Sequence, residues 1–161
     1  MQSRSERPAD WIETILKRDG DRLFRIAAAI MGSRAEAEDV VQDVFVKLVE
    51  KQPVFWSVEH ETAWLVRVTV NLCKNRVRSY WWKKTEMLLD TFPAQDEEEA
   101  GVMQTVMQLP PKYRTVIHLF YYEGYSTKEI AELTQQKEST IRQWLTRARR
   151  KLKDYLEGEY V

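Results

Sequence analysis

The chain has almost none of the residues from which metal and redox sites are built. It contains a single cysteine, Cys73, and two histidines, His60 and His118, which are far apart in the sequence. One cysteine excludes an internal disulfide and fits a reducing cytosol, and this set does not match the ligand spacing of a Cys/His zinc site. We therefore expect no metal, no cofactor and a small buried side chain at Cys73.

The sequence also lacks the patterns of an enzyme and of a membrane or secreted protein. It has no glycine-rich nucleotide-binding loop and no plausible pairing of histidine with serine or cysteine. No apolar run reaches the ~18 residues that a membrane span needs. The polar residues 1–10 lack the apolar core of a signal peptide. We expect a cytoplasmic protein that is not an enzyme.

Glycine and proline are scarce, with five of each in 161 residues, and alternating β-branched runs are few. The sequence therefore predicts an all-α fold. With 43% apolar and 31% charged residues the chain has the composition of a folded soluble protein. Its length suffices for one ordinary domain or two small ones.

The chain has no net charge, since 25 basic residues balance 25 acidic ones, but the charge is sorted into blocks. Residues 62–84 contain six Lys or Arg and no acid, whereas residues 85–101 contain six Asp or Glu and no Lys or Arg. A chain with basic patches but no net positive charge binds bulk DNA weakly. Any DNA binding is therefore expected to need a partner.

The N-terminal part predicts packed helices. Apolar residues recur at three- and four-residue spacing over residues 11–31, as one helix or two short ones, and Gly32 is a stop signal. Ser33 and Glu36 have the capping-box spacing for a helix over residues 34–51. The outer face of that helix is acidic, which fits either plain solubility or a docking surface for a basic partner.

Residues 53–61 predict a loop that carries Phe55 and Trp56, and residues 62–82 predict the next helix. Trp64 on this helix is expected mainly in the core. A polar stripe without an acid runs along the same helix and consists of Arg67, Asn71, Lys74 and Arg78, with Asn75 nearby and the aromatic run Tyr80, Trp81 and Trp82 at its end. Basic side chains interleaved with aromatic rings suit a nucleic-acid strand whose bases are unstacked.

The acidic residues 85–101 predict a flexible linker between two small helical domains, 10–84 and 102–158. In the second domain Pro110 and Pro111 can open a helix, and Ser126 with Glu129 forms a capping box for a short helix. A turn at residues 135–137 then leads into a basic helix over residues 138–153. This order predicts a helix-turn-helix, whose second helix enters the major groove.

The basic helix has an apolar stripe of Ile141, Leu145, Ala148 and Leu152, and guanidinium groups on its other side. Guanidinium forks suit phosphates and guanine edges. A solvated basic face is the bland interpretation of such a helix alone, and the short helix before it favours DNA reading instead.

Three stretches in this order resemble the extracytoplasmic-function class of bacterial RNA polymerase sigma factors. Residues 37–45 (AEDVVQDVF) resemble the family's core-binding segment, and residues 63–71 (AWLVRVTVN) resemble its promoter-melting helix. The stretches 109–114 (LPPKYR), 125–131 (YSTKEIA), 139–142 (STIR) and 147–149 (RAR) resemble its C-terminal domain. The resemblance covers the chain from about Leu23 to Leu156.

The resemblance implies a transcription initiation factor that binds core RNA polymerase and directs it to the −35 and −10 promoter elements, with strand opening at −10. It implies contacts of the acidic helix with the clamp helices of the largest subunit, through Asp39, Gln42, Asp43 and Lys47. It implies −10 contacts by Arg67, Asn71, Lys74, Asn75 and Arg78, with a flipped base received by the loop 53–61. It implies −35 reading by Arg142, Gln143, Thr146 and Arg147, and phosphate contacts by Thr140, Arg149 and Arg150.

The resemblance also implies contact with the flap of the second polymerase subunit and an anti-sigma factor, which could hold the protein at the membrane. Two positions depart from the family: Ser139 replaces a usual glycine and Trp144 a usual arginine. Trp144 lies beside the apolar stripe, so it packs either inward or against DNA sugar. The alternative function is a stand-alone helix-turn-helix regulator, which explains residues 126–153 but neither the segment 37–45 nor the stripe 67–78.

Overall fold

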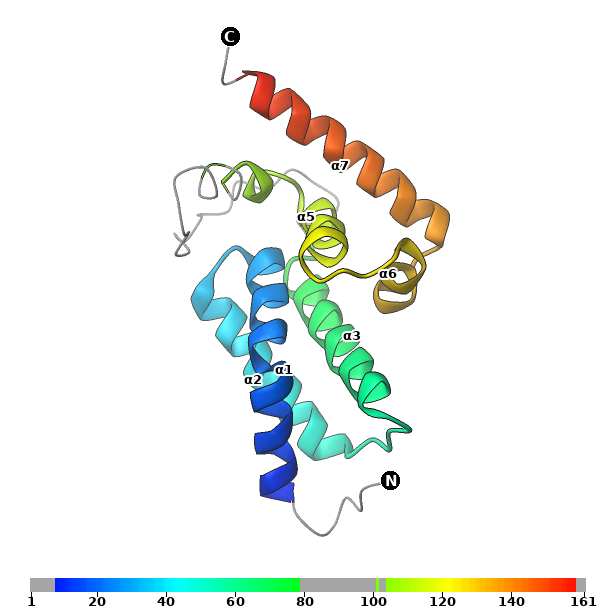
Figure 1. Cartoon of the computed structure of the whole chain (residues 1–161). Helices are drawn as coiled ribbons and strands as arrows, with labels where there is room; N and C mark the ends of the chain where they lie inside the picture. Colours follow the sequence, from blue (N-terminus) through cyan, green and yellow to red (C-terminus); the bar gives the residue numbers. More distant parts are fainter. Residues whose placement is uncertain (1–7, 79–100, 102–103, 159–161) are drawn as a thin grey trace.

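The computed structural model describes residues 8–78, 101 and 104–158, and every regular element in these ranges is helical. The long helices α1 (Pro8–Met31), α2 (Arg34–Lys51) and α3 (Val58–Arg76) form the N-terminal half. The C-terminal half contains α5 (Pro111–Ile117), the π-helix η1 (His118–Tyr122), α6 (Thr127–Thr134) and α7 (Glu138–Gly158). Figure 1 shows α1, α2 and α3 as a bundle, with α5, α6 and α7 stacked at one end of it. The predicted all-α fold is confirmed.

The first two helices follow the predicted bounds closely. Residues 11–31 belong to one continuous helix, and Gly32 ends it with a φ of 70°, a left-handed conformation that glycine adopts without strain. The Ser33 hydroxyl accepts the backbone N–H of Glu36 at 3.3 Å, which fixes the start of α2. Ala37, Val40, Val44 and Leu48 are buried, so this apolar stripe of α2 faces the core shared with α1 and α3.

The predicted start of the third helix at residue 62 is wrong. α3 begins at Val58, because the Ser57 hydroxyl accepts the backbone N–H of His60 at 3.1 Å and two carboxylates, Glu59 and Glu61, lie in the first turn. The loop is correspondingly shorter than the predicted 53–61. The helix ends at Arg76, and Tyr80, Trp81 and Trp82 lie outside the described residues, as does the linker up to residue 100.

The helix-turn-helix is present as predicted. Pro111 opens α5, and η1 ends at Tyr122, before Gly124 turns the chain with a φ of 77°. The capping box is complete, since the Ser126 hydroxyl accepts the Glu129 N–H and the Glu129 carboxylate accepts the Ser126 N–H. Gln135, with a φ of 58°, makes the tight turn into α7, which extends to Gly158.

The two halves pack against each other. α1 contacts α5 and η1, and α3 contacts α6, so one continuous core of buried side chains runs through both halves. The side chain of Arg114 on α5 is completely buried. No helix of the described ranges is long and apolar enough to cross a membrane.

Candidate nucleic-acid interface

The polar stripe on α3 is exposed along one flank of the helix. Its members recur at spacings that keep them on one face. Three of its four members and the neighbouring Asn75 are exposed and Lys74 is half-buried, while Thr69 and Cys73 on the opposite flank are buried. Arg78 lies just past the end of the helix. The exposed residues are Arg67, Asn71 and Arg78 of the stripe, and Asn75 beside it. Beyond the first turn of α3 the stripe meets no acid on its own helix, so it presents a basic face.

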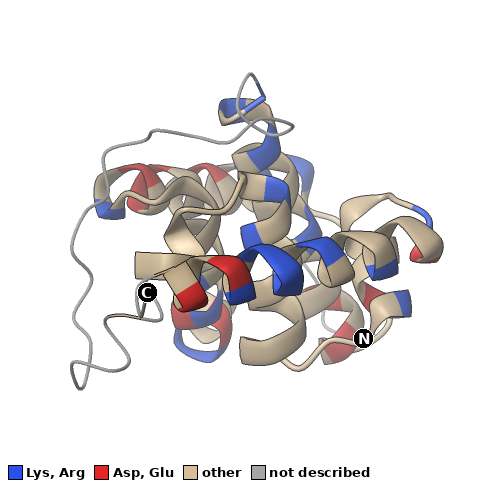
Figure 2. Ribbon diagram, turned by 90° about the horizontal axis from the view of Figure 1, so that it is seen from above, with Lys and Arg blue, Asp and Glu red and all other residues tan. Residues whose placement is uncertain are grey.

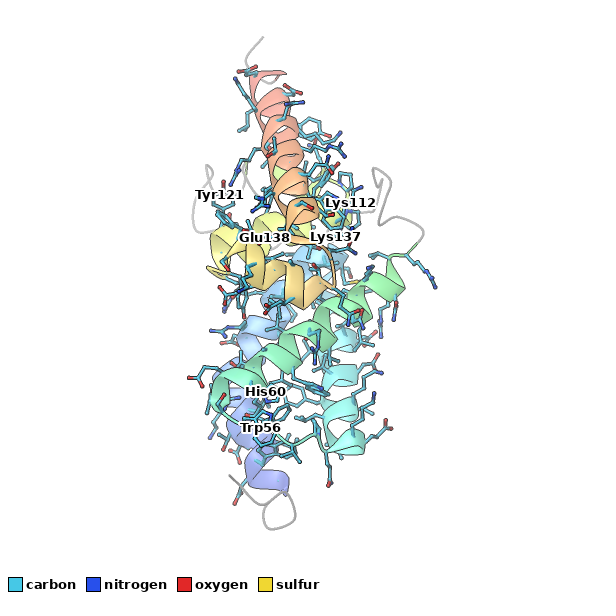
Figure 3. All side chains as sticks on the ribbon, turned by 90° about the vertical axis from the view of Figure 1, so that its right-hand side faces the viewer. Trp56, His60, Lys112, Tyr121, Lys137 and Glu138 are labelled. Carbon is cyan, nitrogen blue, oxygen red and sulfur yellow. The ribbon has the colours of Figure 1, made fainter. Side chains whose placement is uncertain are left out.

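An aromatic cluster lies at the start of α3, where the loop meets the helix. The Trp56 side chain is 83% exposed, yet its backbone N–H donates to Nδ1 of His60 at 3.1 Å. Phe55 packs edge-on against His60 and Trp64, with ring centroids 5.4 and 5.8 Å apart. Trp64 is partly buried against the core, in line with the prediction. Figure 3 shows Trp56 and His60 together at this end of α3. The loop thus exposes the Trp56 indole ring to solvent, while a backbone hydrogen bond ties the loop to α3.

The outer face of α2 carries the predicted docking residues in two environments. Asp39 and Gln42 are exposed, whereas Lys47 is half-buried and Asp43 bonds to Arg76 on α3, its carboxylate accepting from Nη2 at 2.6 Å. Two further residues of this face were missed by sequence reasoning, Val46 and Val49, each 52% exposed. Both lie off the buried stripe of α2, and this position on the helix could have identified them as exposed apolar residues. The face is therefore acidic with an apolar end.

The reading face of α7 is formed largely by the predicted residues. Thr140 is half-buried, and the exposed members are Arg142, Gln143, Thr146, Arg147 and Arg150. Glu138 anchors the start of the helix, accepting from Thr127 of α6 at 3.0 Å and from Arg142 at 3.1 Å. Figure 2 shows successive basic bands along the middle of α7. The first turn of this face is thus fixed by hydrogen bonds, and exposed cations follow further along the helix.

Arg149 differs from the other predicted contacts. Its Nε donates to the Tyr121 hydroxyl at 2.6 Å, and its guanidinium lies 5.6 Å from the ring centroids of both Phe120 and Tyr121. The side chain therefore turns towards η1. The bond to Tyr121 uses only Nε and the residue is exposed, so the phosphate contact stays a prediction.

Trp144 packs inward, since its side chain is only 3% exposed. The ammonium of Lys112, at the start of α5, lies 5.4 Å from its ring centroid and 5.1 Å from that of Tyr113. Burial lowers the pKa of Lys112, and the charge of nearby Arg147 lowers it further. Sequence reasoning missed this cation beside the reading helix, although the resemblance included its motif. Figure 3 places Lys112 and Lys137 next to the first turns of α7.

An apolar groove of about 610 Å³ lies between η1 and the second half of α7. Tyr121 and Tyr122 are more than half exposed on its wall. Its other lining residues are Val106, Ile117, Leu152 and Leu156, with Arg149, Lys153 and Glu157 at the rim. The π-helix turns two adjacent tyrosines outward to make this wall. The groove therefore suits a partner that is apolar at its centre and polar at its edge.

Cys73 and the acidic residues form no metal-type cluster in the described part of the chain. Cys73 is buried, and burial raises the pKa of its thiol. Within residues 8–78, 101 and 104–158, no three His, Cys, Asp or Glu side chains come together as a metal site would require. The exposed features of the described residues are a basic helix with an aromatic loop, a second basic helix, an acidic face and an apolar groove.

Comparison with known proteins defines the class. Residues 15–83 match the family model of Sigma-70 region 2, and residues 100–152 match that of Sigma-70 region 4. The chain is 30% identical to RNA polymerase sigma factor SigZ of Bacillus subtilis, over 75% of this chain and 73% of the relative. The chain belongs to the extracytoplasmic-function class of RNA polymerase sigma factors.

Two further likenesses agree with this assignment. The chain is 30% identical over 91% of its length to the ECF RNA polymerase sigma factor SigE of Mycolicibacterium smegmatis, and it spans 61% of that relative's length. The fold is similar to that of the sigma factor RpoE solved in complex with the anti-sigma factor NepR from Bartonella quintana, with a TM-score of 0.71 and 24% identity. That likeness covers 90% of this chain and 96% of the other. These matches favour an initiation factor over a stand-alone regulator.

Proposed function

We propose that the chain binds core RNA polymerase and directs it to promoters through separate −35 and −10 contacts, with strand opening at −10. The observation that carries the proposal is that one chain has two different basic surfaces, on α3 and on α7. α7 offers forked cations to duplex edges, and α3 offers a polar stripe beside an exposed indole. A duplex reader needs only the first of these surfaces, whereas strand opening also needs the second.

In this proposal the −10 contacts are divided between the stripe and the loop. Arg67, Lys74 and Arg78 hold phosphates, while Asn71 and Asn75 hydrogen-bond to base edges of the separated strand. A base flipped out of the stack costs a few kcal/mol, and stacking on Trp56 returns ~1–3 kcal/mol. The 83% exposure of Trp56 on an ordered loop supports this role.

At −35, Arg142, Gln143, Thr146 and Arg147 read base edges, and Thr140 and Arg150 contact phosphates. Lys112, seated over Trp144 and close to Arg147, adds a further cation to the same side. Two like charges near one another favour an anion between or beside them, and a DNA phosphate is that anion. Arg149, whose bond to Tyr121 uses only Nε, contacts a phosphate through its terminal amino groups.

The polymerase contacts are assigned to the other two surfaces. Asp39, Gln42, Asp43 and Lys47 dock on the clamp helices of the largest subunit, and exposed Val46 and Val49 give this face an apolar end. The apolar groove along Tyr121 and Leu156 receives an apolar helix from the flap of the second subunit. An anti-sigma factor, the kind of partner seen with RpoE, would compete for the same surfaces. In this proposal the protein is cytoplasmic, or held at the membrane by that factor.

The decisive experiment is transcription with purified components. Core polymerase plus this chain should produce promoter-dependent transcripts from genomic DNA, whereas core alone should not. Sequencing the transcript starts would give both promoter elements. Absence of any promoter-dependent transcript, together with failure to co-purify with core, would refute the proposal. Tight and specific duplex binding by the isolated chain would instead point to a stand-alone regulator.

A further inference from the structure

The loop that presents Trp56 is short and is tied at both ends. It consists of residues 52–57, between the end of α2 and the start of α3. At its first residue the backbone N–H of Gln52 donates to a carbonyl in the last turn of α2 at 2.9 Å, and at its last residue Ser57 caps α3. The backbone N–H of Trp56 is fixed by the imidazole of His60. The most exposed large apolar side chain of the described residues therefore belongs to a residue whose backbone is fixed.

His60 and the loop exchange two hydrogen bonds. The Ser57 hydroxyl accepts the backbone N–H of His60 at 3.1 Å, and Nδ1 of His60 accepts the backbone N–H of Trp56 at 3.1 Å. The pattern is that of a capping box, in which the third residue of a helix bonds back to the chain before it, with an imidazole where glutamate or glutamine is usual. Because Nδ1 must offer its lone pair, only the neutral ring with its proton on Nε2 makes this bond.

The first turn of α3 is held on α1 by a polar cluster, so the imidazole stands on a fixed support. Glu61 accepts from Nε1 of Trp11 at 3.1 Å and from Nη2 of Arg18 at 2.6 Å. The hydroxyl of Thr62 donates to Asp19, also on α1, at 2.8 Å. The side chains of Asp19 and Glu61 are 3% and 12% exposed, so water competes little for these bonds. The position of the loop is thereby tied to the core of the bundle through α1.

Packing in the aromatic cluster separates the inner rings from the outer one. Phe55 meets the rings of His60 and Trp64 edge-on, and the Trp64 side chain is partly buried against the core. Within the described residues the Trp56 indole makes no ring contact, and it stays in solvent. A ring that is already held in solvent on a fixed backbone needs little further ordering to stack on a base, and a smaller ordering cost means tighter binding.

We propose that His60 is the positioning residue of this loop: it holds the Trp56 backbone so that the indole is ready to stack on an unpaired base. His60 acts through the backbone of the loop and needs no contact of its own with DNA. The stacking role rests on the function proposed above, whereas the fixed backbone can be measured on the chain alone.

The first measurement is the rate at which the Trp56 amide exchanges with water, followed by NMR on the isotope-labelled full chain. His60→Phe keeps a ring against Phe55 but removes the acceptor, whereas His60→Asn removes the ring but keeps an acceptor at the place of Nδ1. Neither variant changes the sequence neighbours of the amide, so a difference in rate reports the hydrogen bond. We expect the amide to exchange about fivefold faster in His60→Phe than in the parent, and His60→Asn to stay near the parent. Both variants should keep the helical circular dichroism of the parent.

The second measurement is promoter opening with core polymerase, followed by permanganate reactivity of unpaired thymines. His60→Phe should open promoters about fivefold less than the parent, and His60→Asn should stay close to the parent. Binding to the −35 element should be unchanged in both variants. Glu59→Gln, an exposed substitution in the same turn of α3, is the control for both measurements and should match the parent.

Three results would contradict the proposal. A Trp56 amide that is unprotected in the parent, or His60→Asn that behaves like His60→Phe, would show that the acceptor does not fix the loop. Opening by His60→Phe at the parent level would show that the fixed backbone does not serve the DNA contact. If the exchange rates are as expected but the parent opens no promoter, the proposed function fails together with the stacking role, while the positioned loop stands.

Discussion

The two tryptophans at positions 56 and 144 should respond to truncation in opposite ways. Trp144 is 3% exposed, whereas Trp56 is 83% exposed on the loop before α3. Truncating a buried Trp to Ala costs ~3–5 kcal/mol, through lost burial and the cavity that remains. That is a large part of the ~5–15 kcal/mol by which a domain is stable. Trp144→Ala should therefore lower the melting temperature by about 6–20 °C.

Trp56→Ala is the matched control, because it removes the same side chain from the surface. Its free energy of unfolding should stay within ~0.5 kcal/mol of the parent. Promoter opening should instead weaken by ~1–3 kcal/mol, the value of one stacked base. Unfolding is best followed by far-UV circular dichroism, since both variants alter fluorescence, and opening by permanganate reactivity of unpaired thymines with reconstituted polymerase.

Each of the two variants can contradict the role assigned to its tryptophan. A Trp144→Ala variant that unfolds within ~1 kcal/mol of the parent would show that the indole does not fill the core. A Trp56→Ala variant that opens promoters at the parent level would remove the loop from the −10 contact. Trp144→Phe, which keeps an aromatic ring beneath Lys112, should recover much of the lost stability.

Four other substitutions address single contacts or surfaces. Arg142→Ala should cost ~1–3 kcal/mol at one base position of −35 in competition with base-substituted duplexes, and an unaltered preference would exclude a bidentate contact. Asp43→Arg should abolish co-purification with core polymerase; because Asp43 also pairs with Arg76, Asp39→Arg serves as the second variant, and normal binding by both would exclude this face. Lys112→Met should lower the slope of log affinity against log salt by ~1 for the holoenzyme on promoter DNA, with base preference intact, and a parent-like slope would rule out a phosphate contact.

The features predicted from sequence are those that local physics decides. Ser33 and Ser126 cap helices because a hydroxyl reaches an N–H three residues on. Gly32 ends α1 because it adopts a left-handed backbone freely. The helix-turn-helix followed from such signals together with periodic apolar stripes. The missed start of α3 involves the same kind of signal, since Ser57 is the capping residue but was placed inside the predicted loop.

The remaining features depend on contacts between distant segments, which the sequence does not record. Arg114 was identified only as part of a motif, and its bonds to the end of α1 join residues 84 and 85 positions apart. The groove at Tyr121 needs the π-helix, which has no signature in the residue pattern. The inward placement of Trp144 was one of two alternatives, since it lies beside the apolar stripe and the resemblance suggested an arginine there. The position of a residue on its helix thus gave the alternative placements of its side chain, and tertiary packing determined which of them holds.

The continuity of α7 has a mechanical consequence. The helix runs without a break from Glu138 to Gly158, a rigid rod of about 30 Å at ~1.5 Å per residue. Arg142 lies near one end of the rod, and Leu152 and Leu156 form part of the groove near the other. Whatever occupies the groove is therefore held about 15–21 Å along the axis from the DNA-reading side chains. The helix thereby fixes the angle and distance between DNA and a second macromolecule without any direct contact between them.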